Sequence, residues 1–183
     1  MKSFAVAIIV AISAVMPNIG KCESIFEITP SNFLGDLRPK FQKIELMRDF
    51  GDATFPVFMV ESPGIKGFLL ISFFDIRATY PSMKCIQKIP TERALRVARV
   101  QFVPNNPPQT QTLLAKYGKN HSEKLDDNLQ KKLIWKDKGI EAILDPSGQY
   151  VKSVINDFTA EEQEKAAEVS VARIAVTAMG CSE

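Results

Sequence analysis

The sequence has one histidine, one tryptophan and three cysteines, so it is poor in the residues that carry most catalytic and metal chemistry. A catalytic triad or a multi-histidine metal site would depend on His121, which lies in the polar stretch 120–123, typical of a solvated loop. The chain has no phosphate-binding loop, no dinucleotide-binding glycine motif and no G-x-S-x-G motif. We therefore predict no catalytic residue, no cofactor and no metal ligand.

Neither sign of charge is in excess, since 23 lysines and arginines stand against 21 aspartates and glutamates. The basic residues between 116 and 138 are interleaved with acidic ones, as on a mixed, solvated surface. A domain that binds nucleic acid usually has a clustered basic surface and a higher isoelectric point. We therefore expect no nucleic-acid partner.

No apolar run is long enough to cross a membrane, which takes about 20 residues. The run at residues 4–16 follows a short basic start, and this pattern is typical of a secretory signal peptide. Cleavage near Gly20 fits the small-residue rule better than cleavage after Ala14, because Ile12 stands two positions before Ala14. We predict a signal peptide at residues 1–20 and a periplasmic or secreted product.

A cysteine soon after the apolar run, Cys22, raises the alternative of a lipoprotein. The residue directly before it is Lys21, whereas the peptidase that processes lipoproteins needs a small residue at that position. We therefore expect neither a lipid anchor nor a membrane span.

Three cysteines in an oxidising compartment suggest one disulfide and one remaining cysteine. No Cys-x-x-Cys motif is present, which disfavours a metal site. We predict a bridge between Cys85 and Cys181, because it would tie the end of the C-terminal helix to the middle of the chain. A bridge between Cys22 and Cys181 is the alternative.

Short apolar segments separated by glycine and proline predict an α+β fold, and residues 21–183 suffice for a single domain. Cap and stop signals predict helices after Pro30 and after Pro108, which should pack on one face of one or more antiparallel sheets. The order loosely repeats, so residues 25–89 and 95–156 are interpreted as imperfect halves. Apolar patterning predicts strands at residues 25–28, 41–47, 55–60, 67–76, 95–103, 133–135, 140–144 and 150–155.

The segment at residues 68–74 is apolar at nearly every position. A strand of that kind is expected to be buried on both faces, beneath helices or a second layer. As a membrane span it is too short.

The clearest predicted helix lies at residues 159–179. Thr159 and Glu162 form a capping box at its start, and Ala166 and Val169 begin an apolar side. Its second half is rich in alanine and apolar nearly all round. This favours close packing against the sheet, and a helix that docks with another chain is the alternative.

Carboxylates are plentiful, but none forms a recognisable catalytic or calcium-binding pattern. Asp75 and Glu141 stand among apolar residues, where burial could shift a pKa. Asp75 is expected to pair with Arg77 or to face solvent. A secreted hydrolase or effector with an unrecognised carboxylate site around Asp75, Glu141 and Asp157 is the alternative to a protein without catalytic activity.

Two motifs in the second half of the chain resemble a known pattern. Residues 113–118 have the form L-x-x-K-Y-G, and residues 135–137 have the form W-x-D. Together they resemble many small exported bacterial proteins of unknown function, which are themselves similar to the small outer-membrane lipoprotein of the barrel-assembly machinery. The resemblance implies helices on a small antiparallel sheet, an envelope location and no catalytic residues.

The motif residues have physical reasons for structural roles. Tyr117 would anchor its helix to the core, Gly118 would end that helix in a left-handed conformation, and Trp135 would fill the face of the sheet. From the export signal, the predicted fold and the lack of a reactive motif, we expect a non-enzymatic protein that binds another protein or an envelope component.

Overall fold

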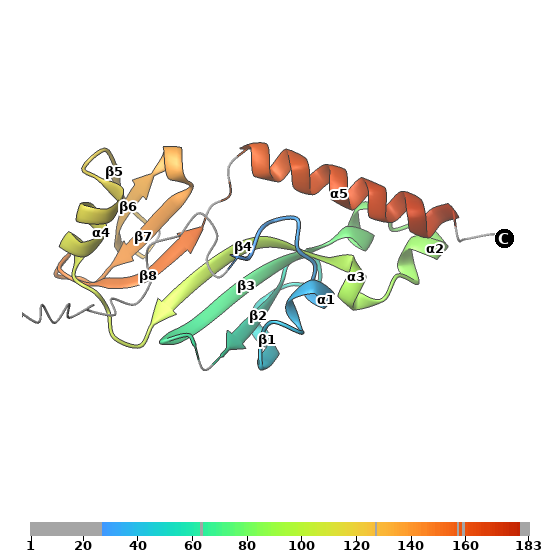
Figure 1. Cartoon of the computed structure of the whole chain (residues 1–183), viewed down its shortest axis with the longest axis horizontal. Coiled ribbons are helices and arrows are strands. Elements are labelled where there is room, and N and C mark those ends of the chain that lie inside the picture. The colour runs from blue at the N-terminus through green and yellow to red at the C-terminus, as the bar shows by residue number, and fades with distance from the viewer. Residues whose placement is uncertain (1–26, 63, 127, 157, 159, 180–183) are drawn as a thin grey trace, which may run out of the picture.

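The computed structural model describes residues 27–62, 64–126, 128–156, 158 and 160–179 (Figure 1). The predicted signal peptide, Cys22, Asp157, Thr159 and Cys181 lie outside these described residues. One antiparallel sheet carries several short helices and one long C-terminal helix. The fold class is therefore α+β, as the sequence predicts.

The sheet has eight strands in the order β1-β2-β3-β4-β8-β7-β6-β5. The sequence predicts each of them except β5, whose polar residues do not alternate with apolar ones. The predicted strand at 25–28 is not formed at its described end, since Ile28 lies outside any strand. The strands are β1 (Lys43–Gly51), β2 (Pro56–Glu61), β3 (Gly67–Asp75), β4 (Leu95–Pro104), β5 (Ser122–Leu125), β6 (Lys131–Trp135), β7 (Ile140–Leu144) and β8 (Val151–Asn156).

Two four-stranded meanders make up the sheet, β1 to β4 and β5 to β8. Within each meander, every strand pairs with its neighbour in the sequence. The two meanders join where residues 100–102 of β4 pair with residues 154–156 of β8. β4 also pairs with β3 over nine residue pairs, so a division between residues 89 and 95 separates two strands that the sheet joins.

The described helical segments are short, apart from α5. Within the described ranges, no helix is long and apolar enough to cross a bilayer. The segments are α1 (Leu34–Leu37), η2 (Ile76–Thr79), α2 (Lys84–Gln87), α3 (Thr91–Ala94), α4 (Thr110–Tyr117), η3 (Lys136–Lys138) and α5 (Ala160–Met179).

Helix α1 begins four residues later than the position of Pro30 predicts. The backbone before it pairs with β4 instead. The Val97 N–H donates to the Asn32 carbonyl at 2.9 Å, and Phe33 forms an antiparallel bridge with Arg96. This pairing holds Phe33 in an extended conformation, so the helix starts only at Leu34.

The first meander is covered on one face. Leu34 and Leu37 of α1 pack against buried side chains of β3, namely Leu69, Ile71 and Phe73. On the other face of β3, the side chains of residues 68, 70, 72 and 74 are only half-buried. The expectation that residues 68–74 are buried on both sides is therefore right for one face only, because α1 lies on one side of the sheet.

A second core lies beneath α4 in the other meander. Leu113 of α4 is buried there, and Leu114 and Tyr117 pack at its margin. The remaining buried members come from β6, β7 and β8: Leu133, Trp135, Ile140, Ala142, Leu144, Val151 and Val154.

The C-terminal helix α5 runs beside the sheet and reaches α2 (Figure 1). Ala166 and Ser170 are buried on one side of it, while Val171 is 60% exposed on another. Its described apolar residues Val169 and Ile174 pack against a separate cluster, whose buried members are Phe33, Ile76, Ile86, Ile89 and Ala94. The helix is therefore packed along one side, with a solvent-facing side opposite.

Candidate functional site

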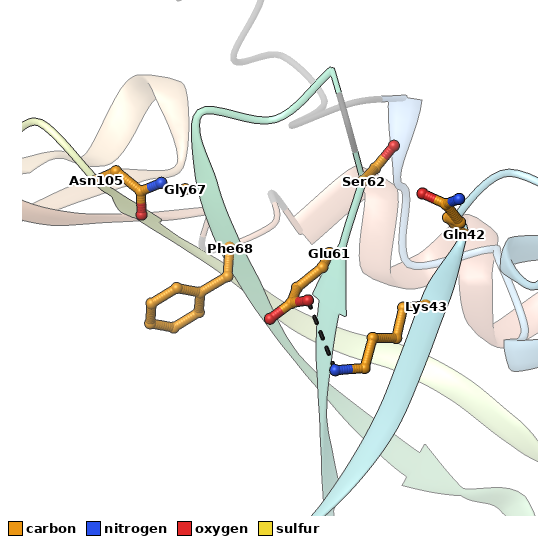
Figure 2. Close-up of a pocket in the computed structure, with 7 residues that line it drawn as sticks. All are labelled: Gln42, Lys43, Glu61, Ser62, Gly67, Phe68 and Asn105. Carbon is orange, nitrogen blue, oxygen red and sulfur yellow. Dashed lines mark ion pairs between the residues drawn. The ribbon is translucent and has the colours of Figure 1, made fainter.

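An open pocket of about 580 Å³ lies at the end of the first meander, where β1 begins and β2 turns into β3 (Figure 2). Leu69 points into the core beneath α1, so its neighbour Phe68, which lines the pocket, points to the opposite face of the sheet. The pocket therefore lies on the face that α1 does not cover. Its lining residues are Gln42, Lys43, Glu61, Ser62, Gly67, Phe68 and Asn105.

A glycine and a backbone hydrogen bond hold the β2–β3 turn against the end of β4. The Asn105 N–H donates to the Lys66 carbonyl at 3.1 Å. Gly67 has a φ of +150°, and a Cβ at this position would meet the carbonyl oxygen of Val103. A glycine is therefore required where the two strands come close, and it leaves bare backbone at the pocket wall.

Two of the lining residues are charged, and they neutralise each other. Lys43 and Glu61 stand opposite each other on β1 and β2, with Nζ and the carboxylate 3.6 Å apart. Glu45 lies 3.2 Å from the same Nζ. The hydrogen bond and charge of Glu45, followed by the charge of Glu61, raise the pKa of Lys43. These side chains are about half exposed, so the pairs add little stability, but they leave the pocket without an uncompensated cation.

The other lining side chains supply uncharged hydrogen-bonding groups beside an apolar wall. The amides of Gln42 and Asn105 each have donors and an acceptor, and the hydroxyl of Ser62 can act as either. Phe68 is half-buried and forms the apolar wall. Such a lining fits a molecule that both donates and accepts hydrogen bonds and has one apolar face.

Sequence reasoning does not find this pocket. Its residues come from four segments that meet only when β1 to β4 pair, and each alone is an ordinary surface residue. The nearest signal is the spacing of Gly64 and Gly67, which marks a turn.

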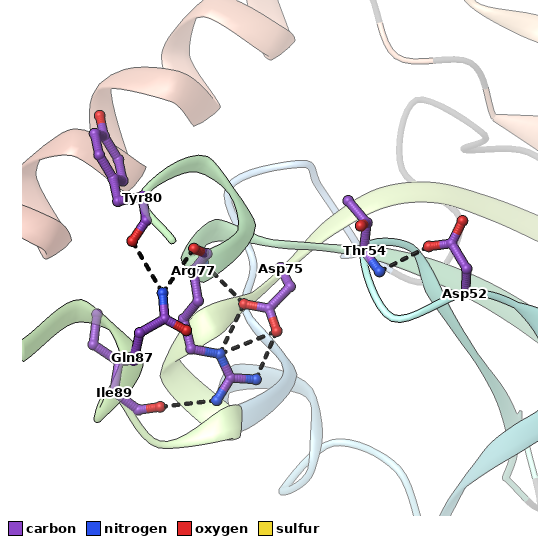
Figure 3. A network of polar contacts seen from close by, with 7 residues as sticks. All are labelled: Asp52, Thr54, Asp75, Arg77, Tyr80, Gln87 and Ile89. Carbon is purple, nitrogen blue, oxygen red and sulfur yellow. Dashed lines mark hydrogen bonds and ion pairs between the residues drawn. The ribbon is translucent and has the colours of Figure 1, made fainter. Parts of the chain in front are cut away.

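Asp75 lies at the opposite end of β3 from the pocket and belongs to a polar network (Figure 3). Its carboxylate accepts hydrogen bonds from the Arg77 backbone N–H and guanidinium at 2.6 to 3.0 Å. That guanidinium also donates to the Ile89 carbonyl, and the Gln87 amide donates to the Arg77 and Tyr80 carbonyls. The hydrogen bond with Asp75 raises the pKa of Arg77. The network ties the end of β3 to the segment that holds α2 and α3.

Glu141, the second candidate carboxylate, lies on β7 and forms an ion pair of 3.5 Å with Lys132. Through β8 and β4 it is in register with Leu70 of β3. Asp75 lies further along β3 and, by strand alternation, on the opposite face, which places the two carboxylates roughly 20 Å apart. Asp157 lies outside the described residues. Asp75 and Glu141 therefore do not converge on one site.

The motif residues of the second meander lie together. The Trp135 side chain is fully buried, and its Nε1–H donates to the Gly118 carbonyl at 2.9 Å. The Tyr117 ring packs beside the indole, with ring centroids 5.3 Å apart. Gly118 ends α4 with a φ of +86°, which favours glycine. These contacts join α4 to the sheet.

His121 is not a solvated loop residue, which corrects the interpretation from sequence. Its side chain is 14% exposed, and its ring packs beside Trp135 with centroids 5.3 Å apart. Nε2 lies 3.6 Å from the Glu123 carboxylate, and Nδ1 is buried with no hydrogen-bond partner among the described residues. Lys131, 2.8 Å from the other Glu123 oxygen, is the main cause that lowers the pKa of Glu123.

In the described part of the chain, no three metal-ligating side chains gather as a metal ion would need.

Cys85 is half-buried beside the cluster that contains Ile86, and it forms no disulfide with any described residue. Both predicted partners in a disulfide, Cys181 and Cys22, lie outside the described residues, so the bridge stays a prediction.

Comparison with protein-family models, with curated proteins and with solved structures finds no match to this chain.

Proposed function

We propose that this chain is an exported, non-enzymatic binding protein, and that the pocket beside Phe68 takes part of an envelope component. The observation that carries the proposal is the lining of the pocket. It presents amide and hydroxyl groups beside an apolar ring, and its one cation is already paired with carboxylates. Such groups orient a ligand and need no reactive centre.

Export and envelope location are part of the same proposal. They rest on the signal-peptide pattern at residues 1–20 and on the resemblance of residues 113–118 and 135–137 to small exported proteins. The contacts of Tyr117, Gly118 and Trp135 are those of structural residues, which agrees with a motif that serves the fold.

The alternative of a carboxylate-based hydrolase has less support. Asp75 is engaged by Arg77, and Glu141 is engaged by Lys132 on the other side of the sheet. A pair of catalytic carboxylates must approach within about 5 to 10 Å of each other, as glycoside hydrolases illustrate.

Export predicts a processed N-terminus. The protein isolated from the exported fraction of its own cells should begin at Lys21, which intact-mass spectrometry would measure. A variant with Val10→Arg, which places a charge in the apolar run, should stay unprocessed inside the cell. A chain that keeps Met1 in the exported fraction, or one that stays in the membrane pellet after a carbonate wash, would contradict the proposal.

Binding to the envelope is tested by co-sedimentation. The purified mature protein should pellet with insoluble envelope material from the same cells, and Phe68→Ala should weaken this at least tenfold. Phe50→Ala is the matched control, because Phe50 is 54% exposed and does not line the pocket. Protease treatment of the envelope material should leave the binding intact. Equal binding by wild type and Phe68→Ala, or loss of binding after protease, would contradict a pocket for a non-protein component.

A further inference from the structure

The charges around the pocket restrict the chemistry of its ligand. Lys43 contacts two carboxylates, those of Glu45 and Glu61, on the strands that border the pocket. An anionic group that approached Lys43 would also approach both carboxylates, and like charges in proximity disfavour binding. Two carboxylates and one ammonium leave a net charge of −1 at this point, which adds to the repulsion of an anion. The charges at the pocket therefore disfavour an anionic ligand.

The uncharged lining requires a ligand that is rich in hydrogen-bonding groups of both kinds. Gln42 and Asn105 stand on different sides of the pocket, with Ser62 near Gln42 (Figure 2). Each amide offers a donor and an acceptor side by side, and this pattern matches a hydroxyl, which also donates and accepts. A peptide backbone would match as well, but it would favour an exposed strand edge, whereas the pocket lies at the end of the strands.

Phe68 and Gly67 provide the apolar and steric parts of the site. The Phe68 ring comes from the sheet face opposite α1, and it is half-buried there. Gly67 follows the turn and has no side chain that could keep a ligand away from the backbone. A sugar ring has an apolar face of C–H groups and a rim of hydroxyls, so it complements an aromatic wall with amides around it.

We propose that the ligand of this pocket is a neutral saccharide, the glycan part of the envelope component. This inference rests on the proposed function, because it identifies the ligand of the same pocket. Phe68 supports one face of a sugar ring, and Gln42 and Asn105 hydrogen-bond to its hydroxyl or N-acetyl groups. Lys43 and Glu61 remain paired with each other and, together with Glu45, disfavour anionic ligands.

Three saccharide probes that differ in charge test the inference. The neutral probe is the trimer of N-acetylglucosamine, the cationic one is the trimer of glucosamine, and the anionic one is an oligomer of glucuronic acid. In NMR titrations of the mature chain, the neutral trimer should shift the backbone amides of Lys43, Phe68 and Asn105. Its dissociation constant should be on the order of 0.1 to 1 mM, since an open site buries little of its ligand. The anionic probe should bind at least tenfold more weakly, and the cationic probe, which lacks the N-acetyl groups, should also bind more weakly than the neutral trimer.

Variants locate the binding and separate it from folding. Phe68→Ala and Asn105→Ala should each weaken binding of the neutral trimer at least fivefold. Asn106→Ala is the matched control, since Asn106 is exposed and adjacent but does not line the pocket. Circular dichroism should give the same spectrum for all three. Mass spectrometry of the recovered trimer should find it intact.

The outcomes distinguish this inference from the proposed function. Equal or stronger binding of a charged probe would overturn the neutral class, and so would shifts that leave the pocket amides unchanged. A wild-type protein that sediments with envelope material but binds none of the probes would overturn the saccharide and keep the binding function. A protein that neither sediments nor binds would overturn both. Cleavage of the trimer would favour the hydrolase.

Discussion

Replacing Trp135 with alanine should lower the free energy of unfolding by about 3 to 5 kcal/mol, which is typical of large-to-small changes at buried aromatic positions. The side chain is fully buried in the core beneath α4, where Leu113 and Leu133 also lie. The substitution leaves a cavity and removes the indole N–H that donates to the Gly118 carbonyl. Urea denaturation followed by circular dichroism measures the change.

Two further variants separate volume from hydrogen bonding at this position. Trp135→Phe keeps most of the ring but leaves the Gly118 carbonyl without the indole donor, so it should cost about 1 to 3 kcal/mol. Phe50→Ala removes an aromatic side chain that is 54% exposed and should cost less than about 1 kcal/mol. A Trp135→Ala variant as stable as Phe50→Ala, or a wild-type indole with water-like fluorescence, would contradict a core role.

Replacing Arg77 with alanine should cost about 2 to 4 kcal/mol. The change leaves the Asp75 carboxylate, 12% exposed, without its guanidinium partner, and it removes the hydrogen bond to the Ile89 carbonyl. Breaking a fully buried pair costs about 3 to 5 kcal/mol, and the Arg77 side chain is 24% exposed, so the loss should be somewhat smaller. Thermal and urea unfolding measure the effect.

A surface ion pair of the same chemistry serves as the control for Arg77. Arg38 lies 3.7 Å from Glu92, and both side chains are about half exposed, at 50% and 48%. Arg38→Ala should therefore change stability by less than about 1 kcal/mol. If Arg38→Ala and Arg77→Ala destabilise equally, the network around Asp75 does not hold β3 to the α2–α3 segment.

Local signals account for the elements that the sequence predicts well. The apolar residues of β7 and β8 are a property of each strand alone, and the turn between them has its own signal in residues 145–148. Gly148 there has a φ of +73°, and the Ser147 hydroxyl donates to Asp145 at 2.6 Å. Such signals need no knowledge of distant residues, so the strands and their order along the chain could be predicted.

The features that the sequence does not predict depend on contacts between distant segments. His121 stands among polar neighbours, which indicates solvent, but the indole of Trp135 binds the Gly118 carbonyl and brings the following loop over its ring. Helix α1 starts late because β4 takes up the backbone before it. The pocket depends likewise on the pairing of β1 to β4, so its residues cannot be recognised individually.

The joint between β4 and β8 has a consequence for how the chain assembles. Inside each meander, strands that pair are neighbours in the sequence. Their pairing closes short loops, except that residues 76–94 separate β3 from β4. Residues 100–102 and 154–156 are the strand segments that must meet across an entire meander. The entropic cost of closing a loop rises with the length of the loop. Pairing these two segments therefore has the largest such cost among the strand pairs of the sheet. Non-local pairing of this kind slows folding, so we expect this joint to form last.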